Sequence, residues 1–375
     1  MKINKPNQRG QIQLTFSWIY IAIAGAVILL FFFSIVVKQK QVSEERLSVE
    51  VVRIMESILT GAGVSESTKN FIDASGLADY TLYFDCIDSV SEFGIQGRPA
   101  RAQNAIDPLF APKTMQGRQI IAWSLPYKLP FKVIDFLLIT SSSNKYYLTG
   151  GDGVFVNEFL NATEGFNREY VTDLSEIDAD SEFDVRIVDA DGTHIPGKKV
   201  PGSLQDFDDL KVSAVVFTGS NQNTIDFYQK EGLEWKKLNK NPVRIISLGG
   251  ERDAAKYAAI FAGDDKTYQC NMQKAFRRLE ILSEVYGGSG IAELQVGGKL
   301  GELQEYYLSQ GLSAHPDCLG NIQNYPDHLT ESLAALKSRA AACQLEEEIC
   351  LDLISTAGKI QDLNNNLRLN CIRLY

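Results

Sequence analysis

Six cysteines carry the clearest chemistry in this sequence. One lies in the first third of the chain and five lie towards the C-terminus: Cys86, Cys270, Cys318, Cys343, Cys350 and Cys371. An even number of cysteines predicts disulfides when a chain is exported from the reducing cytoplasm. We therefore expect at least two bridges, with a connectivity that the sequence does not choose.

The spacing of the last cysteines limits the pairings. If residues 343–350 form one continuous helix, Cys343 and Cys350 lie about 10 Å apart, beyond the reach of a bridge. Cys371 is then the natural partner of one of them. The alternative is a metal site, because His315 and Cys318 have an H-x-x-C spacing that Cys343 and Cys350 could complete. Since the sequence has no C-x-x-C pair, we expect disulfides, no metal and no cofactor.

The sequence contains no recognisable catalytic motif. It lacks the G-x-S-x-G elbow, the phosphate-binding loop and the H-E-x-x-H helix. Its three histidines, His194, His315 and His328, lie in polar turns or at a helix start, where we expect surface side chains. Acidic residues are too many and too scattered to nominate a catalytic pair. An enzyme is therefore the weakest of the hypotheses considered below.

Two loops have the composition of ligand sites. One precedes a predicted helix and could direct backbone amides at an anion; it consists of Gly150, Gly151, Asp152 and Gly153. It lacks the lysine of a phosphate loop and the G-x-G-x-x-G order of a dinucleotide site, so an ordinary turn is the simpler interpretation. The other, residues 189–192 (DADG), begins like a calcium loop but lacks the later acidic ligands, which favours a hairpin turn. A glycosylation sequon follows the glycine loop, with Asn161 as the acceptor if this part faces outward.

The longest apolar run, residues 11–37, is expected to determine where the rest of the chain lies relative to a membrane. No charged residue occurs from Gly10 to Val37, and a helix of this length crosses a hydrocarbon core of about 30 Å. Because backbone amides in lipid must be paired internally, we expect a transmembrane helix. Its most apolar and interfacial residues are Trp18, Ile19, Leu29, Leu30, Phe31, Phe32 and Phe33. Membrane lipid is thus the first expected partner.

The helix is expected to continue past the membrane as a stalk over residues 38–62. Apolar residues recur there with a helical period, and Gly61 and Gly63 predict its end. Ahead of the span, residues 1–10 form a short basic leader, which favours a cytoplasmic N-terminus. Residues 1–47 hold six of the 37 basic and two of the 47 acidic side chains, so the remainder has a net charge of −14. Such an acidic body argues against nucleic acid as a partner.

The first residues also have the pattern of a targeting signal. A basic leader ends in Arg9-Gly10 and is followed by Gln11 and the unbroken apolar run. This pattern resembles the class III signal peptides of archaeal prepilins, over about the first 40 residues. The resemblance implies cleavage between Gly10 and Gln11, and self-assembly or contact with other envelope proteins through the helix. Thr15 departs from it, because pilins usually carry there a glutamate that aligns subunits in a filament. More loosely, the chain is similar to single-span envelope proteins of small-genome archaea.

Residues 63–265 are predicted to form an α/β domain with a mixed, partly parallel sheet. Short runs rich in β-branched and aromatic residues recur, among them 133–140, 184–188, 212–217 and 257–261. Residues 224–239 predict a hairpin that turns at Glu231-Gly232. A ligand site in such a sheet lies at the carboxyl ends of the strands, where we expect the Gly/Ser loops to gather.

Residues 266–375 change to a helical pattern. Apolar stripes within 272–282, 329–343 and 351–367 predict three helices in a part that also holds five of the cysteines. We expect this cysteine-containing helical part to form a lobe continuous with the α/β part.

Three hypotheses for the function follow. The leading one is a single-pass, membrane-anchored extracytoplasmic protein of the cell envelope with a structural or binding role. The first alternative is a pilin-like subunit processed after Gly10. The second is a surface-anchored enzyme with a site at the Gly/Ser loops of the sheet.

Overall fold

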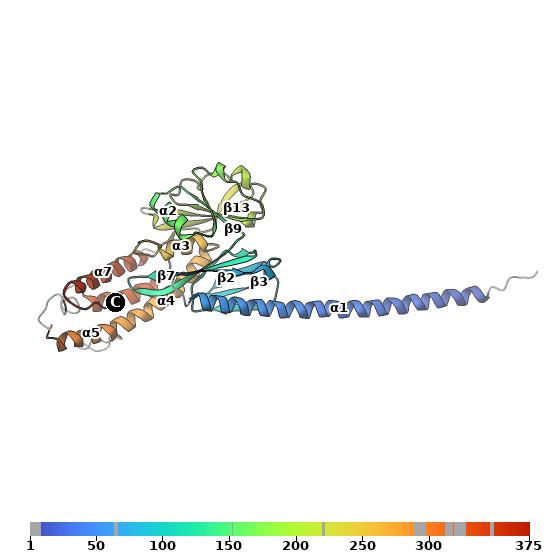
Figure 1. The fold of residues 1–375 in the computed structure, drawn as a ribbon, viewed down its shortest axis with the longest axis horizontal. Helices are drawn as coiled ribbons and strands as arrows, with labels where there is room; N and C mark the ends of the chain where they lie inside the picture. The colour runs from blue at the N-terminus through green and yellow to red at the C-terminus, as the bar shows by residue number, and fades with distance from the viewer. Residues whose placement is uncertain are drawn as a thin grey trace, which may run out of the picture.

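The computed structural model shows one very long helix that leaves a compact body (Figure 1). It describes residues 9–63, 67–151, 153–219, 222–288, 298–311, 318, 328–345 and 349–375. The body contains two four-stranded sheets, one seven-stranded sheet and a group of helices towards the C-terminus. The predicted fold class, α/β with mixed sheets, an N-terminal apolar helix and a helical C-terminal part, is confirmed at this level.

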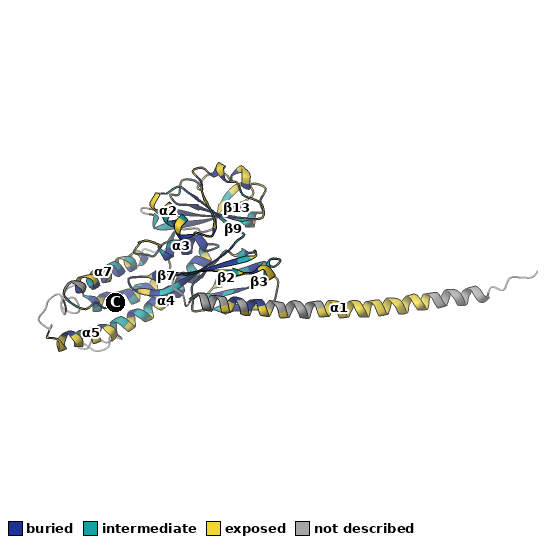
Figure 2. Ribbon diagram, in the orientation of Figure 1, coloured by how far each residue is buried: buried dark blue, intermediate teal, exposed yellow. Residues whose placement is uncertain are grey.

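Helix α1 (Arg9–Gly63) runs unbroken through the predicted span and the predicted stalk. Residues Ile19–Gln39 are apolar enough to cross a membrane, and none of this stretch is buried in the body. Near its C-terminal end the same helix buries Val51, Val52 and Met55 (Figure 2). The side chain of Trp18 and residues 1–8 of the leader lie outside the described residues. One helix therefore has two different surroundings, open at one end and packed at the other.

The C-terminal end of α1 packs against two small sheets. The first has the order β1-β7-β8-β5 and the second the order β4-β3-β2-β6, with β5 parallel to β8 and all other neighbours antiparallel. Their strands are β1 (Lys69–Asp73), β2 (Leu82–Ile87), β3 (Val90–Ile95), β4 (Arg101–Asn104), β5 (Leu109–Phe110), β6 (Thr114–Met115), β7 (Gln119–Lys128) and β8 (Lys132–Ser141). Apolar side chains from both sheets form one cluster with α1, which explains why the helical stripe predicted for the stalk is apolar on one side.

The seven-stranded sheet forms the upper lobe in Figure 1 and has the order β10-β9-β11-β12-β13-β14, with β15 beside β13. Its strands are β9 (Asn144–Thr149), β10 (Asn167–Tyr170), β11 (Asp184–Asp189), β12 (Val212–Thr218), β13 (Thr224–Glu231), β14 (Glu234–Lys237) and β15 (Val243–Arg244). The first four strands of this order are parallel to one another, giving three parallel pairs, and the remaining pairs are antiparallel. The predicted hairpin is confirmed, since Glu231 of β13 pairs with Glu234 of β14 across the turn.

Helices cover the sheets and form the end of the body. They are α2 (Gly153–Ala162), α3 (Ala254–Phe261), α4 (Asp265–Gly287), α5 (Gly298–Ser309), α6 (Leu329–Ala342) and α7 (Ile349–Asn370), with single 3₁₀ turns η1 (Ser75–Leu77), η2 (Leu174–Glu176), η3 (Gly202–Leu204) and η4 (Asp209–Lys211). The strand predicted at 257–261 is wrong, because these residues belong to α3. All but one of the eight residues of α3 are buried, so it shows no polar face that would mark a helix in the sequence. A single apolar cluster joins the first sheet, the seven-stranded sheet and helices α3 to α7.

The described cysteines are all paired, which confirms the prediction of disulfides: Cys86–Cys270, Cys318–Cys371 and Cys343–Cys350. The exclusion of the last pair is wrong, because α6 ends at Ala342 and α7 begins only at Ile349. With the helix broken between them, the two Cα atoms lie 4.9 Å apart. The predicted pairing of Cys371 with Cys343 or Cys350 is likewise wrong. The zinc alternative fails because its three cysteines are in disulfides; His315 lies outside the described residues.

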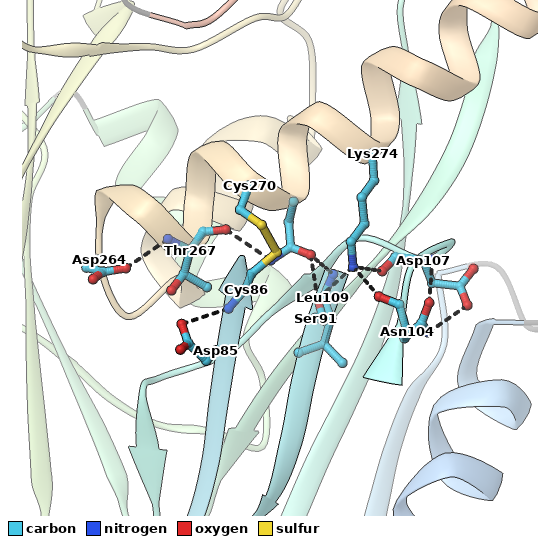
Figure 3. Close-up of a disulfide and its surroundings, with 11 residues drawn as sticks. Asp85, Cys86, Ser91, Asn104, Asp107, Leu109, Asp264, Thr267, Cys270 and Lys274 are labelled. Atoms are coloured by element: carbon cyan, nitrogen blue, oxygen red, sulfur yellow. Dashed lines mark hydrogen bonds between the residues drawn. A yellow bond between two sulfur atoms is a disulfide. The ribbon is translucent and has the colours of Figure 1, made fainter. Parts of the chain in front are cut away.

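Helix α4 is tied to the second sheet by a bridge and a buried polar group (Figure 3). Cys270 of α4 is bonded to Cys86 of β2, which is 184 residues earlier in the chain. One turn further along α4, the ammonium of Lys274 donates to the Ser91 hydroxyl at 2.6 Å and to the carbonyl of Asn104 at 2.8 Å. The helical part is therefore anchored covalently and by hydrogen bonds to the strands nearest α1.

Candidate functional site

Polar loops converge at the carboxyl edge of the parallel strands in the seven-stranded sheet. Strands β9, β11 and β12 are neighbours in this edge and end at residues 149, 189 and 218. Each is followed by a glycine-containing loop, and the loops after β9 and β11 are in direct contact: the amide of Gly151 donates to Asp191 at 3.1 Å. The expectation that Gly/Ser loops gather at this edge is met by these loops. The loop at 140–144 is not among them, since it lies between β8 and β9, at the opposite edge.

Asp189, the last residue of β11, is the buried centre of this loop cluster. Its side chain is fully buried. One carboxylate oxygen accepts from the amide of Gly192, and the other accepts from the amides of His194 and Ile195. Because β12 pairs with β11 in parallel, the loop after Asp189 is the start of a crossover, and the predicted hairpin turn at 189–192 is wrong.

Asp191 occupies the position at which an anion could meet the glycine loop, since its carboxylate accepts from the Gly151 amide. Besides the Gly151 amide, its carboxylate accepts from the amide and the hydroxyl of Thr193. Partial burial tends to raise the pKa of Asp191, but the hydrogen bonds from Thr193 and Gly151 outweigh burial and lower it to about 2. Gly150 has a φ of +68° and passes so close to Asp191 that a β-carbon there would meet the carboxylate at 2.5 Å. The glycines of this loop thus admit a carboxylate from the neighbouring loop.

His194 completes a set of three potential metal ligands. Its Nδ1 atom lies 3.6 Å from an oxygen of Asp189 and 3.4 Å from an oxygen of Asp191. Its side chain is 23% exposed and that of Asp191 36%, whereas Asp189 is inaccessible, so the set opens to solvent on one side only. His194 is partly exposed in a polar turn, as expected for a surface side chain. Its proximity to the two aspartates is not visible in the sequence, because it depends on how the turn DGTHIPG folds.

Thr149 lies beside Asp189 and has an unused hydroxyl. In the parallel pairing of β9 with β11, Thr149 is the direct partner of Asp189, so both side chains project from the same face of the sheet. Thr149 is fully buried, and its Oγ1 atom has no hydrogen-bond partner among the described residues. A buried hydroxyl without a partner is unfavourable unless some group supplies one.

The remaining predicted site residues are placed elsewhere. Gly153 is the first residue of α2, while Asp152 lies outside the described residues. Asn161 is exposed near the end of α2, as an acceptor of a glycan requires. His328 caps the start of α6, where its Nδ1 accepts from the amide of Glu331.

A cavity of about 170 Å³ lies at the amino-terminal edge of the same strands. Asn144, Asp184 and Arg186 line it. Burial raises the pKa of Asp184 to about 6, although Lys211 opposes this. The guanidinium of Arg186 is used internally, because it donates to carbonyls at the end of α3, including that of Ala262 at 2.7 Å. The Arg186 guanidinium is therefore already engaged with the chain and not directed at a ligand.

Comparison of the chain with protein families, with curated proteins and with solved structures finds no match. The functional conclusions below consequently rest on the geometry alone.

Proposed function

We propose that this protein is a single-pass, membrane-anchored extracytoplasmic protein of the cell envelope with a binding role. Helix α1 serves as both anchor and stalk, with the N-terminus in the cytoplasm. The observation that carries the proposal is the contrast along α1. Residues Ile19–Gln39, with a mean hydropathy of 2.8, have no part of the body against them, while Val51 and Met55 are buried in it. An exposed apolar helix of this length needs lipid around it.

The geometry of α1 fixes how far the body stands from the lipid. Between Gln39 and Val51 the helix rises about 18 Å, at about 1.5 Å per residue. This distance exceeds the thickness of one headgroup layer, which is roughly 5–8 Å on each side of the hydrocarbon core. The body is thus held clear of the membrane surface on a short, stiff stalk, which is the arrangement expected for a domain that meets partners or ligands in the envelope.

The disulfides support an extracytoplasmic body. Three bridges persist in an oxidising compartment and are rare where glutathione and thioredoxin keep thiols reduced. Cys318, Cys343 and Cys350 are fully buried, which is typical of structural rather than redox-active cysteines.

A test of sidedness and oxidation uses intact cells that carry the full chain. Protease is added to the intact cells to test sidedness. In a parallel sample the cells are lysed, the protein is denatured, and its thiols are labelled with a maleimide, with and without reductant. We expect no labelling of the native cysteines without reductant, labelling of all six with it, and degradation of the body by protease added outside. Free thiols together with a protease-protected body would show that the topology is inverted.

Two variants that each add one cysteine to the native six provide matched controls for this experiment. Asp206→Cys lies on the exposed surface of the body and should be labelled in intact cells by a membrane-impermeant maleimide. Asn7→Cys lies in the leader and should be labelled only after the membrane is made permeable. The opposite pattern would contradict the proposed orientation even if the disulfides were present.

The second candidate is a pilin-like subunit processed after Gly10. The observation that favours it is that α1 is a single helix whose C-terminal end packs on two mainly antiparallel sheets, while its residues Ile19–Gln39 are not buried in the body. N-terminal sequencing of the mature protein separates the two candidates. Met1 supports a permanent anchor, and Gln11 supports processing of the prepilin type.

A further inference from the structure

We infer that Asp189, Asp191 and His194 bind one divalent transition-metal ion at the carboxyl edge of the seven-stranded sheet. The site deepens the proposed binding role, but it does not depend on which side of a membrane the body lies. The ion class is that of Zn²⁺ or Mn²⁺.

The separations between His194 and the two aspartates are longer than direct hydrogen bonds and leave room for a shared ion. The Nδ1 atom of His194 lies 3.6 Å from Asp189 and 3.4 Å from Asp191, and all three ligand atoms fall within 4.8 Å of one another. Hydrogen bonds between such atoms are normally about 2.7–3.2 Å long. Ligands placed about 2.1 Å from a tetrahedral ion are about 3.4 Å apart, which is close to the distances of 3.6 and 3.4 Å from Nδ1 of His194 to the two carboxylates.

The charge of the cluster also calls for a cation. Two carboxylates each place an oxygen within 4.8 Å of the other, and Asp189 is fully buried. Neither of them pairs with a lysine or an arginine within the described parts of the chain. Backbone amides donate to both carboxylates, but each carboxylate oxygen has two lone pairs and can accept a further partner. A metal ion would neutralise the pair where the protein supplies no permanent positive charge.

The hydroxyl of Thr149 is an independent sign of a missing partner. It is completely buried, has no hydrogen-bond partner among the described residues, and extends from the same face as Asp189 on the adjacent strand. An ion, or a water molecule bound to that ion, beside Asp189 would provide the partner that this oxygen lacks.

The ligand types select the metal class. An imidazole nitrogen suits zinc and other transition metals, and carboxylates suit manganese as well, whereas calcium takes six to eight oxygen ligands. Binding through Nδ1 requires the tautomer with its proton on Nε2. The Thr193 hydroxyl donates to Asp191 and lies 3.0 Å from Nδ1, so an ion bound at Nδ1 replaces the contact between Nδ1 and that hydroxyl. The partly exposed side chains of His194 and Asp191 leave a path for the ion and open positions for water.

The test measures metal binding to the full chain purified in detergent micelles, after removal of metal by a chelator. Titration calorimetry with ZnCl₂, MnCl₂ and CaCl₂ should give one site per chain that binds zinc or manganese more tightly than calcium. His194→Ala should weaken that binding by about tenfold or more, since even outer groups around a metal contribute about 10–100-fold. Asp206→Asn, an exposed change elsewhere on the same domain, should leave it unchanged.

Two further variants separate loss of the site from loss of the fold. Asp191→Asn should weaken binding as His194→Ala does, and Thr149→Val should weaken it less, because it keeps the three ligands. Far-ultraviolet circular dichroism and the thiol count should match wild type for each. Binding of calcium that is insensitive to His194→Ala would overturn the proposal, as would the absence of a saturable site or equal affinities in His194→Ala and Asp206→Asn.

Discussion

The buried lysine of α4 gives the sharpest prediction about stability. The ammonium of Lys274 donates to the Ser91 hydroxyl and to the carbonyls of Asn104 and Asp107, and the residue is only 3% exposed. Burial lowers the pKa of Lys274 from 10.5 to about 7, although the charge of Asp107 opposes the shift. The perturbation is Lys274→Met, which keeps the length of the side chain and removes its titration.

The size of the effect follows from proton linkage. The folded pKa lies below the unfolded value of 10.5, so the unfolded chain binds more protons between about pH 7 and pH 10.5. The contribution of Lys274 to the free energy of unfolding therefore rises with pH across that window and is constant below it. At about 1.4 kcal/mol per unit of pKa, the free energy of unfolding of wild type relative to Lys274→Met should rise by about 3 kcal/mol from pH 7 to pH 10.

The assay is chemical denaturation of both proteins in the same detergent at several pH values. Taking the difference between them cancels the other titrating groups. Lys266→Met, an exposed change on the same helix, serves as the control and should run parallel to wild type. A difference for Lys274→Met that stays flat between pH 7 and pH 10 would refute the reasoning, because it would mean that the lysine remains charged in the folded protein.

The other predictions concern the disulfides and the cavity at the amino-terminal edge. Removing Cys86–Cys270 by paired alanine substitutions should lower stability by about 5 kcal/mol, against about 2.5 kcal/mol for Cys343–Cys350, because the sequence separations are 184 and 7 and longer loops restrict the unfolded chain more. Denaturation of both variants checks the order, and a larger loss for the shorter loop would contradict the entropic account. The pKa of Asp184 is raised to about 6 in the folded protein, so its contribution to the free energy of unfolding is favourable at low pH and is lost as pH rises through about 6. Asp184→Asn should therefore raise the melting temperature above pH 7 and leave it unchanged near pH 4. Calorimetry at the two pH values measures this, and equal shifts at both would count against it.

Local patterns predicted the long elements well. The uncharged run and the apolar stripe after it account for α1, and the turn at Glu231-Gly232 accounts for the hairpin of β13 and β14. Apolar residues that recur with the helical period likewise predicted α4, α6 and α7. These features depend only on residues close in sequence, which is why they can be read without the fold.

Features that depend on distant residues could not be read in this way. The break between Ala342 and Ile349 was invisible because the apolar stripe continues across it, so the pairing of Cys343 was missed. The two-residue strands β5 and β6 have no periodicity to detect.

The candidate site was only half visible in the sequence. The glycine loop has the composition of an anion site although an ordinary turn is the simpler interpretation, and nothing local shows that Asp191, 40 residues away, accepts from its backbone. Likewise, the role of Asp189 depends on β11 lying between β9 and β12 in parallel, which is a property of the sheet order.

The bridge between β2 and α4 has a consequence for biogenesis under the proposed topology. Cys86 crosses the membrane early, but its partner follows only after a further 184 residues have been translocated. During that interval the thiol of Cys86 is unpaired, and the strands beside it are not yet covered by helix α4. The nascent polypeptide thus depends on an oxidoreductase or a holdase in the receiving compartment until nearly three quarters of it has emerged.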